Sequence, residues 1–402
     1  MKVVQISAFS GWGCTGRIAY GIDRALVAAG HESVIAWGRK NTAPQNVHTI
    51  QIGNVIDQAV HGLYARLTDH AGFGSKIVTK KFLKELDTIN PDIIHLQIMH
   101  GYYINLELLF QYIKEKNIPV VWTFHDGWAF TGHCPCYCYN LCDKWKEQCC
   151  DCNRSKYHPV SWFIDDSRKN YLRKMNAFTG VSNMTIVTPS RWFASKVKES
   201  FFKEYPVQVI HNGINVADFK PMQGNTKEKY DLQNKKIILG VSSTWTKEKG
   251  IDDFAELANM VSEEYQIILV GLQPKQMEQL PDSIIKIGHT DSVQELAMLY
   301  TDADVFVNAT YEDNYPTSNL EAIACGTPVI TYDVDGSIES VQESSMGKIV
   351  EPGNIKALYQ AIQEVTNISE EYKNRGLVID QQLCYQEYVE LYEEIYQNRY
   401  GR

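Results

Sequence analysis

The sequence predicts an α/β protein with two doubly wound parallel sheets. Short runs rich in Val and Ile alternate with segments whose apolar residues recur at helical spacing, which is typical of parallel strands joined by helices. The alternation is interrupted by a polar segment at 212–229 and then restarts. The chain has 402 residues, which exceeds the size at which one hydrophobic core usually stops growing. These observations favour two α/β domains.

The strands are expected in two groups. The first half contains predicted strands at 2–9, 32–38, 47–52, 92–98, 119–125, 184–190 and 206–212. The second half contains predicted strands at 236–242, 265–271, 284–289, 303–309 and 327–333. We therefore expect an N-terminal domain over 1–217 and a C-terminal domain over 218–380. The last stretch, 381–402, has aromatic residues at helical spacing, and we expect a helix that returns to the first domain.

The two halves differ in charge. Residues 1–217 carry 24 Lys and Arg against 17 Asp and Glu, whereas the remainder carries 15 against 31. This asymmetry favours two domains with different partners, although ordinary surface variation explains it equally well. The lysine-rich segment 72–86 has the composition of a helix that lies on an anionic membrane surface, and a solvated helix explains it as well.

The chain shows no apolar run of about 18 residues and no signal-peptide core. We therefore expect a cytoplasmic protein, located at the inner face of the cytoplasmic membrane if segment 72–86 binds lipid. We expect no nucleic acid partner.

Two candidate sites of the first half follow predicted strands, where ligands of open parallel sheets bind. Gly11, Gly13 and Gly16 would let the backbone approach a phosphate or a sugar closely, and Arg17 adds a positive charge. Their spacing is not the dinucleotide fingerprint, and an ordinary turn is an equal explanation. His125 ends another strand, where a neutral imidazole can donate to a hydroxyl or a phosphate, although a lone His is more often structural.

Two candidate sites of the second half also follow strands. Lys249 precedes Gly250 and a predicted helix, a position that suits a pyrophosphate, whereas a solvated loop Lys is the simpler interpretation. In "YEDNYPTSNLEAIACGTPVITYD", Ser318 and Glu321 are in register for a capping box, and Asp313 can form a turn. The two carboxylates could instead contact two ends of one polar ligand.

Together these segments resemble the retaining GT-B glycosyltransferases of family 4. The signature of that family is an acidic residue, seven residues and then Glu, followed by "EAxAxGTPVI", and Asp313 and Glu321 occupy the two acidic positions. The segments "RALVAAGHE", "VTPSRWFASK", "VIHNGINVADFKP" and "KEKGIDDF" also match in order. "GHCPCYCYNLCDKWKEQCCDC" resembles members that build bacterial capsule, O-antigen or exopolysaccharide. The resemblance implies two Rossmann-like domains that face a central cleft.

The resemblance also implies roles for the candidate residues. Glu321 would bind the ribose of a nucleotide sugar, Asp313 the donor sugar and Lys249 the diphosphate, and His125 would lie near the reacting sugar. His125, Asp313 and Lys249 form the implied catalytic set. The remaining donor-binding residues would be Gly16, Arg17, Ser243, Thr244, Asn314, Pro316, Thr317 and Ser318.

Two positions depart from the pattern of the family. Asp313 stands where the family usually has Glu, and Glu312 is adjacent. Thr244 stands where the family often has Arg, so one phosphate contact is missing or supplied elsewhere, with Lys247 as the candidate.

The implied reaction is glycosyl transfer with retention of anomeric configuration. A UDP-sugar is the favoured donor, a GDP-sugar is the alternative, and the acceptor is a saccharide or a lipid-linked saccharide. No metal cofactor is implied for catalysis, because Lys249 and backbone amides can stabilise the leaving diphosphate. Two other classes stay open: a nucleotide-sugar 2-epimerase of the same architecture, and a non-catalytic nucleotide-sugar-binding subunit.

Seven of the ten cysteines lie between residues 134 and 152. Four thiolates could hold a structural zinc ion, and Cys149 and Cys152 form a Cys-x-x-Cys pair. The resemblance selects Cys134, Cys142, Cys149 and Cys152 as the zinc ligands, and a reduced loop without metal is an equal alternative. In either case the loop follows His125, and we expect it to shape the acceptor site.

Overall fold

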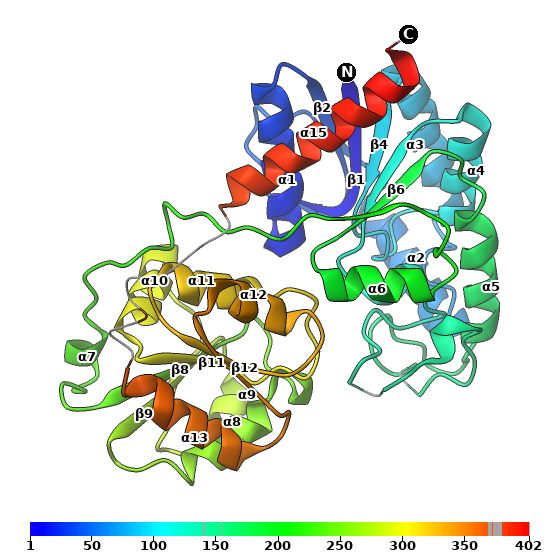
Figure 1. Ribbon diagram of the computed structural model, residues 1–402. Helices are drawn as coiled ribbons and strands as arrows, with labels where there is room; N and C mark the ends of the chain where they lie inside the picture. The colour runs from blue at the N-terminus through cyan, green and yellow to red at the C-terminus, as the bar shows by residue number, and fades with distance from the viewer. Residues whose placement is uncertain (140, 154, 369–371, 373–379, 402) are drawn as a thin grey trace. The chain divides into compact units, whose positions relative to one another are not determined.

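The computed structural model describes residues 1–139, 141–153, 155–368, 372 and 380–401. It contains two compact units, each built on a parallel sheet with helices packed against it (Figure 1). Unit 1 comprises Met1–Ile210 and Gln382–Arg402, and unit 2 comprises His211–Gln381. The predicted α/β fold with two doubly wound sheets is confirmed.

In the described residues, the sheet of unit 1 has seven parallel strands in the order β3-β2-β1-β4-β5-β6-β7. The strands are β1 (Lys2–Ser10), β2 (Glu32–Asn41), β3 (Thr49–Gln51), β4 (Ile93–Leu96), β5 (Val120–Thr123), β6 (Met184–Thr188) and β7 (Val207–Val209). The strand order reverses between β1 and β4. The carboxyl ends of these strands are therefore the expected ligand-binding edge.

The helices of unit 1 bury the apolar faces of this sheet. They are α1 (Gly13–Ala28), α2 (Val55–Thr68), α3 (Lys76–Ile89), α4 (Leu106–Lys116), α5 (Ser167–Phe178), α6 (Arg191–Glu199) and α15 (Gln381–Tyr400), with short 3-10 turns at η1 (Gly127–Ala129) and η2 (Lys144–Lys146). At the centre of the core, the Trp122 ring on β5 packs against Phe110 and Phe178, with ring centroids 5.2 and 5.0 Å away. This packing holds the strand that leads to His125.

The described part of unit 2 contains a six-stranded parallel sheet in the order β10-β9-β8-β11-β12-β13. Its strands are β8 (Lys236–Val241), β9 (Tyr265–Val270), β10 (Ile285–Ile287), β11 (Val305–Asn308), β12 (Val329–Tyr332) and β13 (Gly347–Val350). Its helices are α7 (Thr226–Lys229), α8 (Ile251–Ala258), α9 (Pro274–Gln279), α10 (Val293–Asp302), α11 (Thr317–Ala324), α12 (Ser337–Ser344) and α13 (Ile355–Thr366). A 3-10 turn, η3, covers Lys247–Lys249. The half-buried edge strand β13 is absent from the sequence-based prediction, because Gly347 and Lys348 leave it only two apolar residues. The order reverses between β8 and β11, so the loops after these strands form the expected ligand edge.

The first unit ends at Ile210, earlier than the predicted boundary at 217. The segment after Ile210 belongs to unit 2 because Ile214 packs in a small core with Tyr315 and Leu320. In addition, the Asn212 side chain donates to the Tyr315 carbonyl over 3.3 Å. Segment 212–229 is mostly polar, but a few of its apolar residues pack in unit 2. These residues therefore set the boundary between the two units.

The lysine-rich segment forms α3, but its apolar residues do not face solvent as a membrane-lying helix would require. Val78, Phe82 and Leu86 are buried in the core of unit 1, and the lysines are exposed. Ile77 is the exception, with a largely exposed side chain. None of the helices in the described part of the chain has the length and apolar character needed to cross a bilayer.

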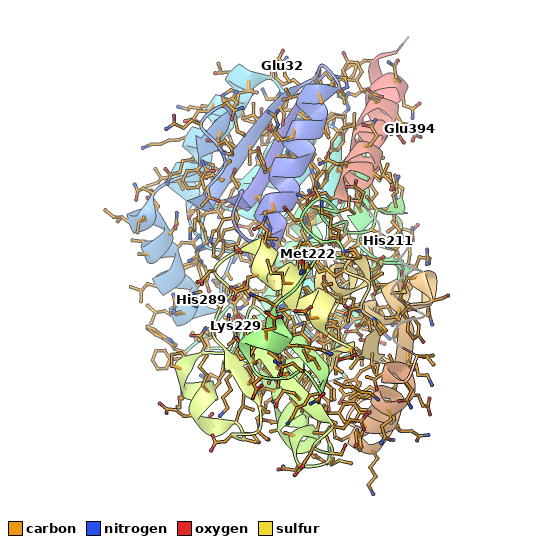
Figure 2. All side chains as sticks on the ribbon, turned by 90° about the vertical axis from the view of Figure 1, so that its left-hand side faces the viewer. Glu32, His211, Met222, Lys229, His289 and Glu394 are labelled. Carbon is orange, nitrogen blue, oxygen red and sulfur yellow. The ribbon has the colours of Figure 1, made fainter. Side chains whose placement is uncertain are left out.

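The C-terminal helix α15 belongs to unit 1, as expected. Its Tyr392 hydroxyl hydrogen-bonds to His95 Nδ1 over 2.8 Å, and His95 Nε2 pairs with the Thr123 hydroxyl over 2.8 Å. Tyr388 reaches the same Thr123 hydroxyl over 3.1 Å. The opposite side of the helix is mostly polar, and Glu394 on it is exposed (Figure 2). These buried hydrogen bonds fix α15 on β4 and β5.

Burial of His95 predicts that acid destabilises unit 1. Desolvation, with a smaller effect from the charge of His125, lowers the pKa of His95 to about 3, so the folded state favours the neutral imidazole. The unfolded state binds the proton near pH 6.5, and stability is therefore lost as the pH falls below that value. We expect a loss of about 2 kcal/mol from this residue at pH 5 relative to pH 8.

Denaturant unfolding at the two pH values measures this loss. His95→Gln should unfold with a smaller pH dependence than the native chain. The matched control His289→Ala, at a surface side chain of unit 2 labelled in Figure 2, should keep the native dependence. An equal pH dependence in His95→Gln would contradict the assignment.

Candidate active site

Lys249 lies at the carboxyl edge of the unit 2 sheet and contacts the loop that carries Asp313. Its ammonium group donates to the Asp313 carboxylate over 2.7 Å and to the Glu312 carbonyl over 3.2 Å. The Thr310 hydroxyl is a third partner at 3.3 Å. The Lys249 and Asp313 side chains are 33% and 26% exposed, so the pair is accessible to a ligand. The structure thus brings together two residues that are 64 positions apart.

Gly250 makes this arrangement possible. It adopts a left-handed conformation with φ of 72°, and a Cβ atom at this position would stand 2.2 Å from the Ala309 carbonyl oxygen. Ala309 directly follows β11 and precedes the Asp313 loop. The Tyr311 amide donates to the Glu248 carbonyl over 2.8 Å and joins the same two loops. The close backbone approach therefore positions Lys249 against Asp313.

Glu321 lies on α11 and does not form the capping box that its spacing with Ser318 suggests. The N-cap residue is Pro316, which has no side-chain donor or acceptor, and Ser318 is already inside the helix. The Glu321 carboxylate instead accepts a hydrogen bond from the Tyr300 hydroxyl over 3.0 Å. Burial raises the pKa of Tyr300 well above its usual value, so this hydroxyl stays protonated and donates. The capping interpretation of Glu321 is therefore wrong.

The remaining predicted donor residues of unit 2 lie in two loops. Asn314, Thr317 and Ser318 are half-buried around the start of α11, and Pro316 is buried. Ser243 and Thr244 are exposed after β8. The helix dipole and the first-turn amides of α11 make its start favourable for negative charge.

Whether Lys247 takes the place of the missing arginine stays a prediction. Its ammonium group lies 3.6 Å from the Asp252 carboxylate, and 76% of its side chain is exposed. The Thr244 hydroxyl donates to the Ser243 carbonyl over 2.8 Å. Among the residues named for the diphosphate, Lys249 is thus the cation that contacts the Asp313 loop.

In unit 1, the glycine segment forms the turn from β1 into α1. Gly11 has φ of 69°, and a Cβ there would stand 2.6 Å from the Ala43 amide nitrogen. The Gly11 amide donates to the Gly16 carbonyl over 2.8 Å, and Gly16 lies in the first turn of α1 against Phe9. Arg17 is exposed on the same helix. Gly11 and Gly16 therefore have a packing role, whereas nothing lies within 4 Å of a Cβ placed at Gly13, and whether these glycines also contact a phosphate stays a prediction.

His125 follows β5 and is held as a neutral imidazole. Desolvation, partly offset by the Asp126 carboxylate, lowers its pKa to about 4. Asp126 accepts a hydrogen bond from the Trp128 amide over 2.9 Å and so begins the turn η1. At neutral pH, His125 can therefore donate or accept a hydrogen bond but does not carry a charge.

His100 is a candidate residue that the sequence reasoning missed. It follows β4, the neighbour of β5, and its Nε2 lies 2.8 Å from the Asp126 carboxylate. Burial alone would raise the pKa of Asp126, but the charge and hydrogen bond of His100 hold it below its usual value. The sequence offered only a partial signal, because a His follows each of two predicted strands but the fold alone makes these strands neighbours. The pair forms a polar site at the carboxyl edge of the sheet.

A buried lysine, Lys174, holds the segment that follows Asp126 at the carboxyl edge of the unit 1 sheet. It is buried on α5 and donates to the Trp128 carbonyl over 2.7 Å and to the Thr131 carbonyl over 3.1 Å. Desolvation lowers its pKa to about 7, since nearby charges only partly compensate. Lys174 thereby fixes the segment that follows His125 and Asp126, and nothing in the local sequence pattern distinguishes it from a surface lysine.

The four predicted zinc ligands line one cavity of about 270 Å³ in unit 1. The Cys134 and Cys152 thiols are hydrogen-bonded, and this contact raises the pKa of Cys134. Burial raises the pKa of Cys149 to about 12. However, within the described residues no three Cys, His, Asp or Glu side chains have the arrangement of a metal site. The cysteines are therefore gathered but do not form a closed coordination shell.

Two Rossmann-like units, with a Lys–Asp pair at the strand ends of the second, have the architecture of the GT-B class. The chain belongs to glycosyltransferase family 4: the sequence profile described as "Glycosyltransferase Family 4" matches residues 15–218, half of the chain. A second profile, described as "Glycosyl transferases group 1", matches residues 235–367. The predicted family membership is confirmed.

Curated relatives are distant in sequence. The Escherichia coli protein described as "Putative colanic acid biosynthesis glycosyl transferase WcaC" is 25% identical over 335 residues, covering 77% of this chain and 78% of that protein. The N,N'-diacetylbacillosaminyl-diphospho-undecaprenol alpha-1,3-N-acetylgalactosaminyltransferase of Campylobacter jejuni is 25% identical over 49% of this chain and 56% of its own length. The O-antigen chain mannosyltransferase RfbU of Salmonella typhimurium is 27% identical over 54% and 59%.

Solved structures share the fold over the whole chain. A sucrose-phosphate synthase from Thermosynechococcus elongatus has a TM-score of 0.71 and 16% identity, covering 99% of this chain and all of that one. Anabaena HepE, solved in complex with UDP, has a TM-score of 0.63 and 13% identity over 98% of this chain and 100% of its own. At these identities, the likeness establishes the GT-B fold alone.

Proposed function

We propose that this glycosyltransferase moves a sugar from a UDP-sugar to a saccharide or lipid-linked saccharide acceptor, with retention, during assembly of a bacterial surface polysaccharide. The observation that carries the proposal is the Lys249–Asp313 pair at the strand-end edge of the unit 2 sheet, followed along the chain by Glu321 on α11. The names of WcaC and RfbU support the polysaccharide pathway. The HepE complexes with UDP and UDP-glucose support the donor class.

The proposed chemistry assigns one task to each group. Glu321, oriented by Tyr300, accepts hydrogen bonds from ribose hydroxyls, and Asp313 accepts from hydroxyls of the transferred sugar. On donor binding, the Lys249 ammonium group also contacts the diphosphate. It stabilises the negative charge that develops there as the sugar–phosphate bond breaks. The acceptor oxygen bonds to the anomeric carbon on the same face, and its proton passes to the leaving phosphate oxygen. Neutral His125 hydrogen-bonds to the reacting sugar.

Release of nucleoside diphosphate tests the proposal. Purified protein is incubated with a panel of UDP- and GDP-sugars, with and without a lipid-linked acceptor fraction. We expect release from one UDP-sugar, stimulated by acceptor and reduced about 10²-fold or more in Glu321→Ala and in Asp313→Ala. The control Glu278→Ala, at an exposed carboxylate of α9, should keep native activity.

The other outcomes of this assay separate the alternatives. Nucleotide release without acceptor dependence would favour a nucleotide-sugar 2-epimerase. Tight UDP binding without turnover in the presence of acceptor would favour a non-catalytic binding subunit. Native activity in both carboxylate variants would overturn the assignment of the site.

We also propose that Cys134, Cys142, Cys149 and Cys152 hold a structural zinc ion, with no part in the reaction. Zinc requires thiolates, so binding would release protons from thiols whose pKa is raised in the metal-free protein. We expect elemental analysis to find one zinc ion per chain. The ion should be lost in Cys149→Ser/Cys152→Ser and retained in Cys136→Ser/Cys138→Ser. A native protein free of zinc would establish the reduced thiol loop instead.

A further inference from the structure

A short segment of unit 2, residues 211–214, lies against the loop that carries Asp313. The His211 ring, labelled in Figure 2, stacks on the Tyr315 ring, with centroids 4.6 Å apart and an interplanar angle of 21°. The Asn212 side chain, which donates to the Tyr315 carbonyl, provides a second contact. Stacked rings attract one another beyond the area that they bury. Two successive residues of the segment therefore hold Tyr315.

This segment is itself fixed in unit 2. Ile214 is buried against Tyr315 in a small core that is separate from the main core of the unit. The Gln381 amide donates to the Ile214 carbonyl over 2.9 Å. A Cβ at Gly213 would stand 2.4 Å from the Gln381 Cα, so the two backbones are in close contact. The Tyr315 ring thus rests on a firmly held stretch of chain.

Tyr315 in turn holds one oxygen of the Asp313 carboxylate. The Tyr315 amide donates to Asp313 Oδ1 over 3.2 Å, whereas Asp313 Oδ2 accepts from the Lys249 ammonium group over 2.7 Å. The ion pair alone fixes one oxygen, and the amide fixes the rotation of the carboxylate about it. Movement of the Tyr315 backbone would therefore turn the carboxylate without breaking its pair with Lys249.

We propose that His211 is a positioning residue for the donor sugar: its ring fixes Tyr315 and thereby orients the Asp313 carboxylate. The inference rests on the proposed function, in which Asp313 accepts hydrogen bonds from hydroxyls of the transferred sugar. A displacement of about 1 Å in such a contact can cost two orders of magnitude in rate. Glu321, which would bind the ribose, is held by a different contact, with the Tyr300 hydroxyl. Loss of the stack should therefore impair use of the sugar more than binding of the nucleotide.

Donor kinetics and nucleotide binding of His211→Ala test this difference. We expect kcat/KM for the UDP-sugar to fall about tenfold, with the Kd for UDP unchanged in calorimetry, since UDP lacks the group that Asp313 contacts. Rates are normalised to the number of UDP sites, which removes any contribution from unfolded protein. His289→Ala, at an exposed histidine of the same unit, should keep native values of both constants.

The conservative variant separates the ring stack from other properties of the histidine. His211→Phe keeps a planar ring that can stack on Tyr315, and it should recover most of the native kcat/KM. A loss in His211→Phe equal to that in His211→Ala would show that the stack is not what orients Asp313, and would overturn the inference.

Hydrogen exchange tests the positioning without any substrate, so its outcome does not depend on the glycosyltransferase assay. In the peptide that contains Tyr315, exchange should be about two- to tenfold faster in His211→Ala than in the native chain or in His211→Phe. Unchanged exchange there, native kcat/KM in His211→Ala, or an equal weakening of UDP and UDP-sugar binding would each overturn the inference. A native chain that releases no nucleotide from any donor would overturn the proposed function instead, and the exchange result would still decide whether His211 positions Asp313.

Discussion

Replacing Lys249 by Met should lower kcat/KM for donor turnover by about 10²–10³-fold. The ammonium group contacts Asp313, Glu312 and Thr310 in the structure, and in the proposed reaction it faces the charge that develops on the leaving diphosphate. Methionine keeps much of the side-chain volume but removes the charge. Because that charge acts mainly in the transition state, kcat should fall more than KM rises.

Lys247→Met is the matched control for this prediction. Lys247 lies in the same short 3-10 turn, but its side chain is largely exposed and pairs with Asp252. We expect near-native kcat/KM in steady-state assays of this variant. Equal losses in both variants would show that the turn, and not the Lys249 charge, is what the reaction requires.

Gly250→Ala should abolish donor turnover and destabilise unit 2. The added Cβ would meet the Ala309 carbonyl oxygen at 2.2 Å, and the residue also has a left-handed φ of 72°. Relief of the clash has to separate the Lys249 turn from the loop that carries Asp313. Left-handed strain alone costs about 1 kcal/mol, and we expect the backbone clash to raise the total to roughly 3 kcal/mol or more.

Gly30→Ala isolates the effect of the backbone conformation. Gly30 has a φ of 80°, and no atom lies within 4 Å of the position a Cβ would take. Denaturant unfolding should show a loss of about 1 kcal/mol in this variant, with donor turnover unchanged. A similar small loss in Gly250→Ala would mean that the β11 loop moves freely and does not position Lys249.

Much of the donor site was predictable because its residues lie in short segments with strong local signals. Lys249 precedes a helix, and Asp313 and Glu321 stand eight positions apart around a strand–turn–helix unit. What each carboxylate contacts was not predictable. The spacing of Ser318 and Glu321 suggested a capping box, but Pro316 takes the N-cap position and Tyr300, from another helix, donates to Glu321.

The sites of unit 1 were less predictable, because they join residues that are distant in sequence. His125 was visible at a strand end, whereas the His100–Asp126 pair depends on β4 and β5 being neighbours in the sheet. Lys174 has the local sequence of a surface residue and is nonetheless buried against the turn after Asp126. Contacts of this kind depend on strand order and helix orientation, which local periodicity does not encode.

The sequence by itself determined the fold class, the two-domain organisation and the family, because these depend on local periodicity and on motifs in order along the chain. Tertiary structure alone decided the boundary at Ile210, the burial of the apolar side of α3 and the exposure of that of α2. An amphipathic pattern indicates that a helix has an apolar side. Packing in the tertiary structure decides whether protein or solvent covers that side. For α2, packing leaves that side exposed to solvent.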